Sequence, residues 1–307
     1  LSKVGFNYEE QVLYNVIIQG TDSGGESVTR SFVVTVSDDN DAPTTMTLSE
    51  AAITENSDVG TEIGLLSAED ADSGDTHTFT VISGSEFVSI TGNHLLSKVV
   101  FDYETQSIYN VTIQGTDSGG ESVTTSFVVT VSDDNDAPTT ITLSAGTITE
   151  NSAIGIEIGL LSAADVDSGD THTFTVVSGS EFVSVSGNQL LSKVAFDYET
   201  QSIYNVTIQG TDSGGKTVTT SFVVTVIDDN DALTTILLSA GTITENSVIG
   251  TEIGLLSAED VDSGDTHTFT VISGSEFVSV TGNHLLSEVV FDYEEQVNYN
   301  FIIQGTD

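Results

Sequence analysis

The chain contains the stretch YNVTIQGTDSGGESVTTSFVVTVS at residues 109–132, in which hydrophobic and polar residues alternate on both sides of a glycine pair. Tyr109, Val111 and Ile113 fall on one face of an extended chain, because successive side chains of a strand point to opposite faces. Ser118-Gly119-Gly120 is a turn signal between the two alternating segments. We therefore predict two neighbouring antiparallel strands, each with one face in a hydrophobic core.

The stretch belongs to a sequence repeat with a period of 95 residues. The phrase FDYE, or a close variant of it, begins at Phe6, Phe101, Phe196 and Phe291. A fixed period indicates repeated structural units, and a unit of this length can bury a core of its own. We predict a partial unit at 1–42 (the C-terminal half), complete units at 43–137 and 138–232, and a partial unit at 233–307 without its last strand. On this interpretation the chain is a piece of a longer array, and it shows no signal peptide or membrane span.

The unit at 43–137 contains about seven alternating runs separated by turn signals. They lie near 45–54, 61–68, 76–83, 87–91, 94–99, 109–116 and 123–132. This pattern predicts an all-β fold of seven-stranded, Greek-key, immunoglobulin-like sandwiches. The short linker DDNDAP at 133–138 contains a proline, so we expect successive sandwiches to be joined end to end.

The composition is strongly acidic, with 47 Asp and Glu residues, 5 Lys and Arg residues and a formal net charge of −42. Such a charge repels nucleic acid and anionic membranes, so we expect neither a nucleic-acid partner nor direct membrane insertion. There is no cysteine, so disulfides cannot stabilise the fold, and bound metal is the usual substitute in secreted proteins.

Acidic residues recur in every unit in the phrases ITEN, D-x-D, D-Y-E and GTD, and again in the linker. In an end-to-end array, ITEN and D-Y-E fall beside the following linker, and D-x-D and GTD fall beside the preceding one. Carboxylates at this density repel one another unless cations bridge them. Calcium, which accepts about six to eight oxygen ligands in loose geometry, suits them better than magnesium or zinc. The alternative is that these residues are solvated loop acids, and the extra acids Asp75, Asp170 and Asp265 stay unassigned.

Taken together, these phrases resemble cadherin repeats, and they are most similar to the cadherin-like repeats of large bacterial surface and adhesin proteins. The family linker D-x-N-D-N-x-P appears here as DDNDAP, its D-R-E as D-Y-E, its D-x-D as DAD or DVD, and its acidic x-E-x as TEN. Ala137 replaces the second linker Asn, which the resemblance expects to act through its backbone carbonyl. Asn7 replaces the Asp of D-Y-E in the first unit. The resemblance implies roughly two to three calcium ions at each junction.

The resemblance also implies a ligand set for each junction. For the first junction the residues are Glu9, Asp39, Asn40, Asp41, Asp70, Asp72 and Asp117. For the central junction they are Glu55, Asp102, Glu104, Asp134, Asn135, Asp136, Asp165, Asp167 and Asp212. For the third junction they are Glu150, Asp197, Glu199, Asp229, Asn230, Asp231, Asp260, Asp262 and Asp307.

No catalytic arrangement of Ser, His and Asp, or of Cys and His, is identifiable, so we do not expect an enzyme. The five histidines, His77, His94, His172, His267 and His284, are interpreted as exposed strand residues. The alternative function is a calcium-dependent array of carbohydrate-binding modules. Sugar platforms usually need exposed Trp or Tyr, whereas this chain has no Trp and its tyrosines fall in phrases assigned to the core.

The sequence therefore predicts a calcium-rigidified extracellular rod or filament with a structural or adhesive role, on a cell surface or secreted. Its expected partners are other copies of the same array or another cell-surface protein, with a polysaccharide as the alternative.

Overall fold

The computed structural model describes residues 4–307, which form two compact units, one up to Asp136 and the other from Ala137. The regular structure in these residues is β-strand, as the sequence predicts. No helix in residues 4–307 is long and apolar enough to cross a membrane.

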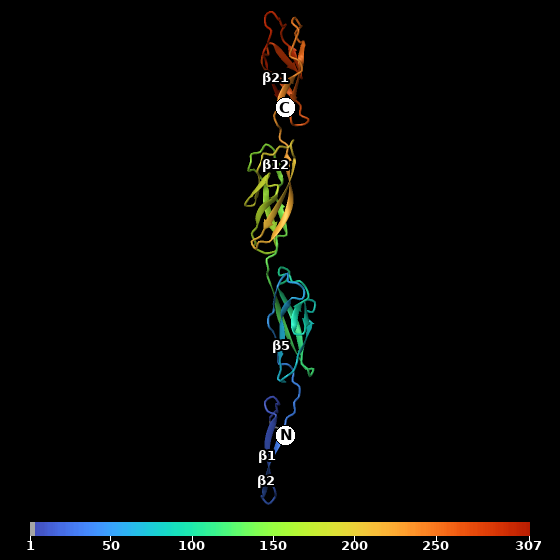
Figure 1. Ribbon diagram of the computed structural model, residues 1–307, viewed down its shortest axis with the longest axis vertical. Helices are drawn as coiled ribbons and strands as arrows, with labels where there is room; N and C mark the ends of the chain where they lie inside the picture. Colours follow the sequence, from blue (N-terminus) through green and yellow to red (C-terminus); the bar gives the residue numbers. More distant parts are fainter. Residues whose placement is uncertain (1–3) are drawn as a thin grey trace. The chain divides into compact units, whose positions relative to one another are not determined.

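The first unit contains a hairpin and a sandwich of two four-stranded sheets (Figure 1). The hairpin pairs β1 (Leu13–Thr21) with β2 (Ser27–Thr35). One sheet has the order β3-β5-β8-β7, with β3 at Thr45–Leu48, β5 at Glu62–Glu69, β8 at His94–Ser97 and β7 at Val88–Thr91. The other has the order β4-β10-β9-β6, with β4 at Ala52–Thr54, β10 at Ser122–Ser132, β9 at Ile108–Thr116 and β6 at Thr78–Ser83. Strands β4 and β10 are parallel.

The second unit begins with a sandwich of the same topology, in which the sheets are β11-β13-β16-β15 and β12-β18-β17-β14. Its strands are β11 (Thr140–Leu143), β12 (Thr147–Thr149), β13 (Glu157–Ala164), β14 (Thr173–Ser178), β15 (Val183–Ser186), β16 (Gln189–Ser192), β17 (Ile203–Thr211) and β18 (Thr217–Ile227). A further set follows, with the sheet β19-β20-β23-β22 and the pair β21-β24. Its strands are β19 (Thr235–Leu238), β20 (Glu252–Glu259), β21 (Thr268–Ser273), β22 (Val278–Thr281), β23 (His284–Ser287) and β24 (Ile302–Thr306).

The last set differs from the two complete sandwiches at its second sheet. Strands β4 and β12 pair in parallel with β10 and β18. The described residues contain no counterpart of β10 in the last set, and residues 242–244, which correspond to β4, form no strand. Ile243, Ile253 and Phe301 line a cavity of about 530 Å³ there.

Core packing fixes the position of the D-Y-E phrase. Tyr109, Val111 and Ile113 are 7%, 0% and 0% exposed, so the alternation predicted for this strand is confirmed. The ring of Phe101 meets that of Tyr109 edge to face, with centroids 4.7 Å apart, which is a favourable aromatic geometry. Because Phe101 directly precedes Asp102, its burial holds the start of the acidic phrase at the end of the sandwich.

The single strand predicted at 45–54 is wrong, because the structure divides this segment between the two sheets. The hydroxyl of Ser49, just after β3, accepts a hydrogen bond from the backbone N–H of Leu65 on one sheet. The carbonyl of Ala51, just before β4, accepts one from the backbone N–H of Thr130 on the other sheet. The chain therefore crosses between the sheets at residues 49–51, and each complete sandwich has eight strands instead of seven.

Candidate metal centres at the ends of the repeats

A buried glutamate joins three segments at one end of each complete sandwich. Glu150 directly follows β12 and is 2% exposed. Its Oε2 accepts a hydrogen bond from the backbone N–H of Tyr198 at 2.8 Å, and its Oε1 accepts one from the backbone N–H of Asp229 at 2.9 Å. These bonds, that from Tyr198 first, hold the pKa of Glu150 below its usual value. Glu55 makes the equivalent two bonds in the first unit, each at 2.8 Å.

The asparagine after this glutamate adopts a left-handed backbone conformation. The φ angles of Asn56, Asn151 and Asn246 are 56°, 55° and 57°. Asn is one of the few residues besides Gly that tolerate this region. The Nδ2 of Asn151 donates to Oδ1 of Asp231 at 2.9 Å, and that of Asn56 donates to Oδ1 of Asp136 at 3.1 Å. The ITEN asparagine, which sequence reasoning did not single out, therefore orients a linker aspartate that was predicted as a ligand.

Carboxylates from separate segments gather at the same ends. In the second unit, Glu150, Glu199 and Asp228 each offer an oxygen within 4.8 Å of the others. Burial raises the pKa of Asp228, and the negative charges of Asp262 and Glu150 raise it further. The pKa of Glu199 is also raised, by burial and then by the charges of Glu150 and Asp228. Like charges crowded in this way favour neutralisation by protons or by a cation.

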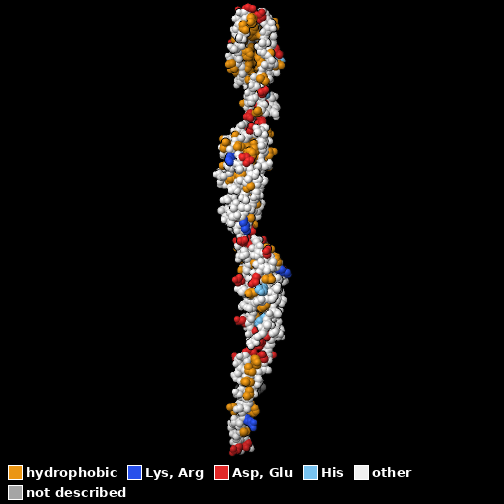
Figure 2. All heavy atoms as spheres, in the orientation of Figure 1, with side chains coloured by type: hydrophobic (Ala, Val, Ile, Leu, Met, Phe, Trp, Pro, Cys, Tyr) orange, Lys and Arg blue, Asp and Glu red, His pale blue; other side chains and the backbone are white. Residues whose placement is uncertain are grey.

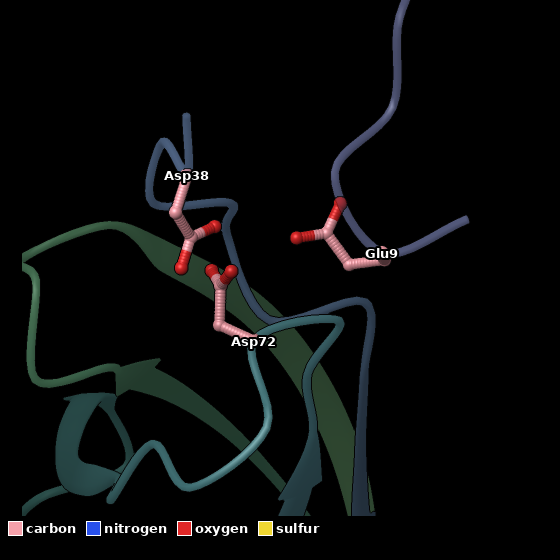
Figure 3. A group of neighbouring side chains, drawn as sticks. All are labelled: Glu9, Asp38 and Asp72. Carbon is pink, nitrogen blue, oxygen red and sulfur yellow. The ribbon is translucent and has the colours of Figure 1, made fainter. Parts of the chain in front are cut away.

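Three such groups lie in the first unit, one of them formed by Asp70, Asp75 and Asp117. Glu9, Asp38 and Asp72 offer oxygens within 4.8 Å of one another, and Figure 3 shows the carboxylates of Asp38 and Asp72 facing each other while that of Glu9 points toward them. They come from the turn before β1, the linker after β2 and the loop after β5. The three residues of this group therefore come from the segment before one linker, from the linker itself and from the segment after it. Glu55, Asp102 and Glu104 form another group. Figure 2 shows Asp and Glu side chains gathered at several places on the surface.

Linker residues also contact the D-x-D and GTD phrases of the repeat that follows. The backbone N–H of Asp41 donates to Oδ2 of Asp72 at 2.7 Å, and Nδ2 of Asn40 donates to Oδ2 of Asp117 at 3.2 Å. The second unit repeats both bonds, between Asp231 and Asp262 and between Asn230 and Asp307, at 2.6 and 3.1 Å. Burial alone would raise the pKa of Asp117, but hydrogen bonds from Asn40 and from the backbone of residues 119–121 hold it below its usual value.

Several carboxylate oxygens at these ends are buried without a hydrogen-bond partner. They are Oδ1 of Asp72, Oδ2 of Asp75, Oδ2 of Asp170 and Oδ1 of Asp262. Buried polar atoms nearly always have a partner in native proteins, so each of these oxygens needs an ion or an ordered water. Carboxylate oxygens are the ligands that calcium prefers, whereas structural zinc takes Cys or His. The residues present therefore fit calcium. Asp75, which sequence reasoning left unassigned, lies in a carboxylate group with Asp70 and Asp117.

Two linker acids that were not predicted as ligands lie in the carboxylate groups. Asp39, Asp134 and Asp229 were predicted as ligands. The groups contain Asp38 and Asp228, one residue earlier, while Asp134 and Asp229 donate their backbone N–H groups to the buried glutamates. Metal binding by Asp39, Asp134 and Asp229 stays a prediction. Alignment of D-x-N-D with DDND could have identified Asp38 and Asp228, because the first Asp of the motif then falls on them.

The other predicted ligands lie in the same phrases. Asp197 accepts hydrogen bonds from the backbone and the hydroxyl of Thr200, which hold its pKa below the usual value, and Asp102 is bonded in the same way to Thr105. Asn135 donates to the carbonyl of Asp136 at 2.9 Å. The remaining members, described with the second unit, are Asp165, Asp167, Asp212 and Asp260. Because the central set is divided between the two units, its assembly stays a prediction.

Two expectations about aromatic and histidine residues are wrong. His77, His172 and His267 precede strands β6, β14 and β21, and their side chains are only 13%, 12% and 19% exposed because each packs against the first Asp of D-x-D. His94 and His284 are exposed as expected. The D-Y-E tyrosines are not in the core: Tyr103, Tyr198 and Tyr293 are 39%, 38% and 62% exposed, because the preceding Phe takes the buried position.

Comparison with known proteins agrees with this geometry. Residues 49–132 match the family described as Cadherin domain. The chain is 27% identical over 328 residues to human "Protocadherin Fat 1", covering 97% of this chain and 7% of that protein. It is 30% identical over 322 residues to "Protocadherin gamma-A10" of Pan troglodytes, covering 94% of this chain and 34% of that protein. The chain thus spans about a third or less of the length of these relatives.

Solved structures share the fold. "Protocadherin Gamma B2 extracellular cadherin domains 1-5" aligns with a TM-score of 0.64 at 23% identity, covering 99% of this chain and 64% of that one. "Crystal Structure of Mouse Cadherin-23 EC22-24" aligns with a TM-score of 0.63 at 21% identity, covering 88% and 94%. At these identities the likenesses concern the fold. The chain is built from tandem β-sandwiches with the fold of cadherin domains, and residues 49–132 match the cadherin domain family.

Proposed function

We propose that the chain is part of an adhesive extracellular rod or filament whose successive repeats are held in fixed orientation by calcium ions at their junctions. The observation that carries this proposal is the grouping of carboxylates from two repeats and their linker, as in Glu9, Asp38 and Asp72. A bound calcium ion supplies positive charge and accepts several oxygen ligands at once. Residues on both sides of a linker that share such an ion lose their mutual repulsion and their freedom to move apart.

The proposed junctions divide the chain into repeats at 1–42, 43–137, 138–232 and 233–307. The ligand sets are those of the sequence analysis, with Asp38 and Asp228 added on the evidence of their positions. We propose a non-enzymatic role, with other copies of the array or another cell-surface protein as partners. The closer likeness to bacterial cadherin-like repeats stays a prediction, since the relatives reported above are animal protocadherins. No observation favours the carbohydrate-binding alternative.

Isothermal titration of the calcium-free chain with CaCl₂ tests this proposal. We expect roughly two to three ions at each junction, bound with affinities that magnesium does not match, because magnesium requires a stricter octahedral geometry. A matched titration with MgCl₂ is the control for simple charge neutralisation. Equal responses to the two ions, or no saturable binding, would identify the acidic groups as solvated surface residues.

The substitution Asp75→Asn is expected to act in opposite directions with and without calcium. Oδ1 of Asp75 accepts a hydrogen bond from the Ser118 hydroxyl at 2.8 Å, while its buried Oδ2 has no partner. Loss of this charge should weaken calcium binding by roughly tenfold, or about 1.4 kcal/mol. In chelator the variant should unfold at the same or a higher temperature, because an unpaired buried charge is removed. Glu86→Gln, at an exposed position of the same repeat, is the control. Unchanged calcium affinity would show that Asp75 only shapes the turn.

A further inference from the structure

Three of the five histidines occupy one structural position that the proposed function does not explain. Nε2 of His172 lies 3.0 Å from Oδ2 of Asp165, and the side chains are 12% and 3% exposed. The same contact measures 3.2 Å between His77 and Asp70 and 3.3 Å in the last set of strands. A carboxylate can only accept hydrogen bonds, so Nε2 carries the hydrogen and donates it.

The second oxygen of the same aspartate is also held. Oδ1 of Asp165 accepts a hydrogen bond from the backbone N–H of Asp167 at 3.3 Å, and Asp70 makes the equivalent bond at 3.2 Å. An ionised carboxylate has about four lone-pair sites, so two remain for other partners. The aspartate is thus fixed at both oxygens and can still bind a cation. One of its two donors lies inside D-x-D, and the other comes from seven residues later in the chain.

We propose that His77, His172 and His267 are positioning residues of the calcium centres, each holding the first aspartate of D-x-D in the orientation that binds the ion. This inference rests on the proposed function. Hydrogen bonds from outside the ligand shell orient ligands and commonly change metal affinity by about 10–100-fold. In the first unit the held aspartate, Asp70, lies in a carboxylate group with Asp75 and Asp117, whose oxygens lie within 4.8 Å of one another. A buried carboxylate that could rotate among these acids would lose ligand geometry.

The position of each histidine also argues against a role in packing alone. The residue that follows it begins β6, β14 or β21, so the paired strand fixes the backbone from which the ring projects. Two residues after the histidine, Phe79 or Phe174 packs against the hydrophobic core. The ring itself instead contacts a carboxylate that is 3–4% exposed.

The test uses the full chain with all three positions changed together. The triple variant His77→Phe, His172→Phe, His267→Phe keeps a flat ring but removes the donor, and the triple Gln variant restores an N–H donor near Nε2. The double variant His94→Gln, His284→Gln is the control, because Gln189 already occupies the equivalent exposed position in the middle repeat. Calcium affinity is measured by calorimetry, and the fold by thermal unfolding in EGTA.

We expect the Phe variant to bind one class of calcium ions about 10–100-fold more weakly, the Gln variant to recover most of this loss, and the control to be unchanged. The unfolding temperature in EGTA should be similar for all variants. Unchanged affinity of the Phe variant would overturn the inference, as would equal losses in the Phe and Gln variants accompanied by lower stability in EGTA. If the unsubstituted chain binds no calcium, both the proposed function and the inference fail. The other two negative outcomes overturn the inference alone and leave the proposed function standing.

Discussion

Removal of calcium with a chelator is expected to lower the unfolding temperature of the chain by about 10–20 °C. One ligand present at 100 times its Kd stabilises the folded state by roughly 2.7 kcal/mol, so a single calcium ion per repeat accounts for this shift and further ions at the junction enlarge it. Each kcal/mol shifts the midpoint of a domain of this size by about 4–8 °C. Burial and neighbouring carboxylates raise the pKa values of Asp228, Asp231 and Glu199, so the calcium-free chain is folded against the repulsion of these charges. Differential scanning calorimetry in CaCl₂ and in EGTA measures the shift.

Small-angle X-ray scattering of the same samples tests whether calcium also limits movement at the junctions. In EGTA we expect the scattering profile of folded repeats that move relative to one another on flexible linkers. EGTA with about 1 M sodium chloride is the control, because a Debye length of roughly 3 Å removes long-range repulsion without bridging any ligands. Recovery of the calcium midpoint and profile by salt alone would argue for screening instead of specific sites. Unchanged midpoints and profiles in EGTA would contradict the proposal that calcium fixes the junctions, although the repeat fold would stand.

The elements that could be predicted from the sequence are those in which a local pattern determines burial. The alternation around Val111 predicts which residues are buried, because successive side chains of a strand point to opposite faces of the sheet. The glycine turn before β10 indicates a hairpin between β9 and β10. The crossing at residues 49–51 could not be predicted in this way. Period two shifts there from Met46 and Leu48 to Ile53, but such a shift fits a bulge within one strand as well as a change of sheet. The change of sheet depends on Ser49 and Ala51 finding partners on strands far along the chain.

The candidate site was partly predictable for the same reason. Repetition of ITEN, D-x-D and D-Y-E singled out the acids that are predicted as ligands, and Glu150 joins three of the segments concerned. Whether Asp228 or Asp229 presents its carboxylate depends on the direction of side chains in an irregular linker, for which no periodicity exists. His172 was misjudged because its partner, Asp165, lies across a turn whose geometry depends on a left-handed Gly169.

Replacement of the buried glutamate, Glu150→Ala, is expected to destabilise the chain more in calcium than in EGTA. Its carboxylate accepts two backbone hydrogen bonds, and bonds of this kind to a charged group contribute about 1.5–3 kcal/mol each. In calcium the variant loses these bonds and a proposed ligand, so we expect a loss of about 3 kcal/mol or more. In EGTA the same change also removes the repulsion that Glu150 exerts on Asp228 and Asp231, which offsets part of the loss.

The control for this experiment is Glu181→Ala, which removes an exposed glutamate from the same repeat and should change stability equally little in both conditions. Chemical denaturation of the two variants and the unsubstituted chain, each in CaCl₂ and in EGTA, gives the difference between conditions directly. A loss that is the same in both conditions would show that Glu150 stabilises the linker through its backbone bonds alone. A larger loss in EGTA would contradict both the ligand role of Glu150 and its repulsion of the neighbouring carboxylates. Only a loss that grows with calcium joins the buried glutamate to the metal, because the backbone bonds are present under both conditions.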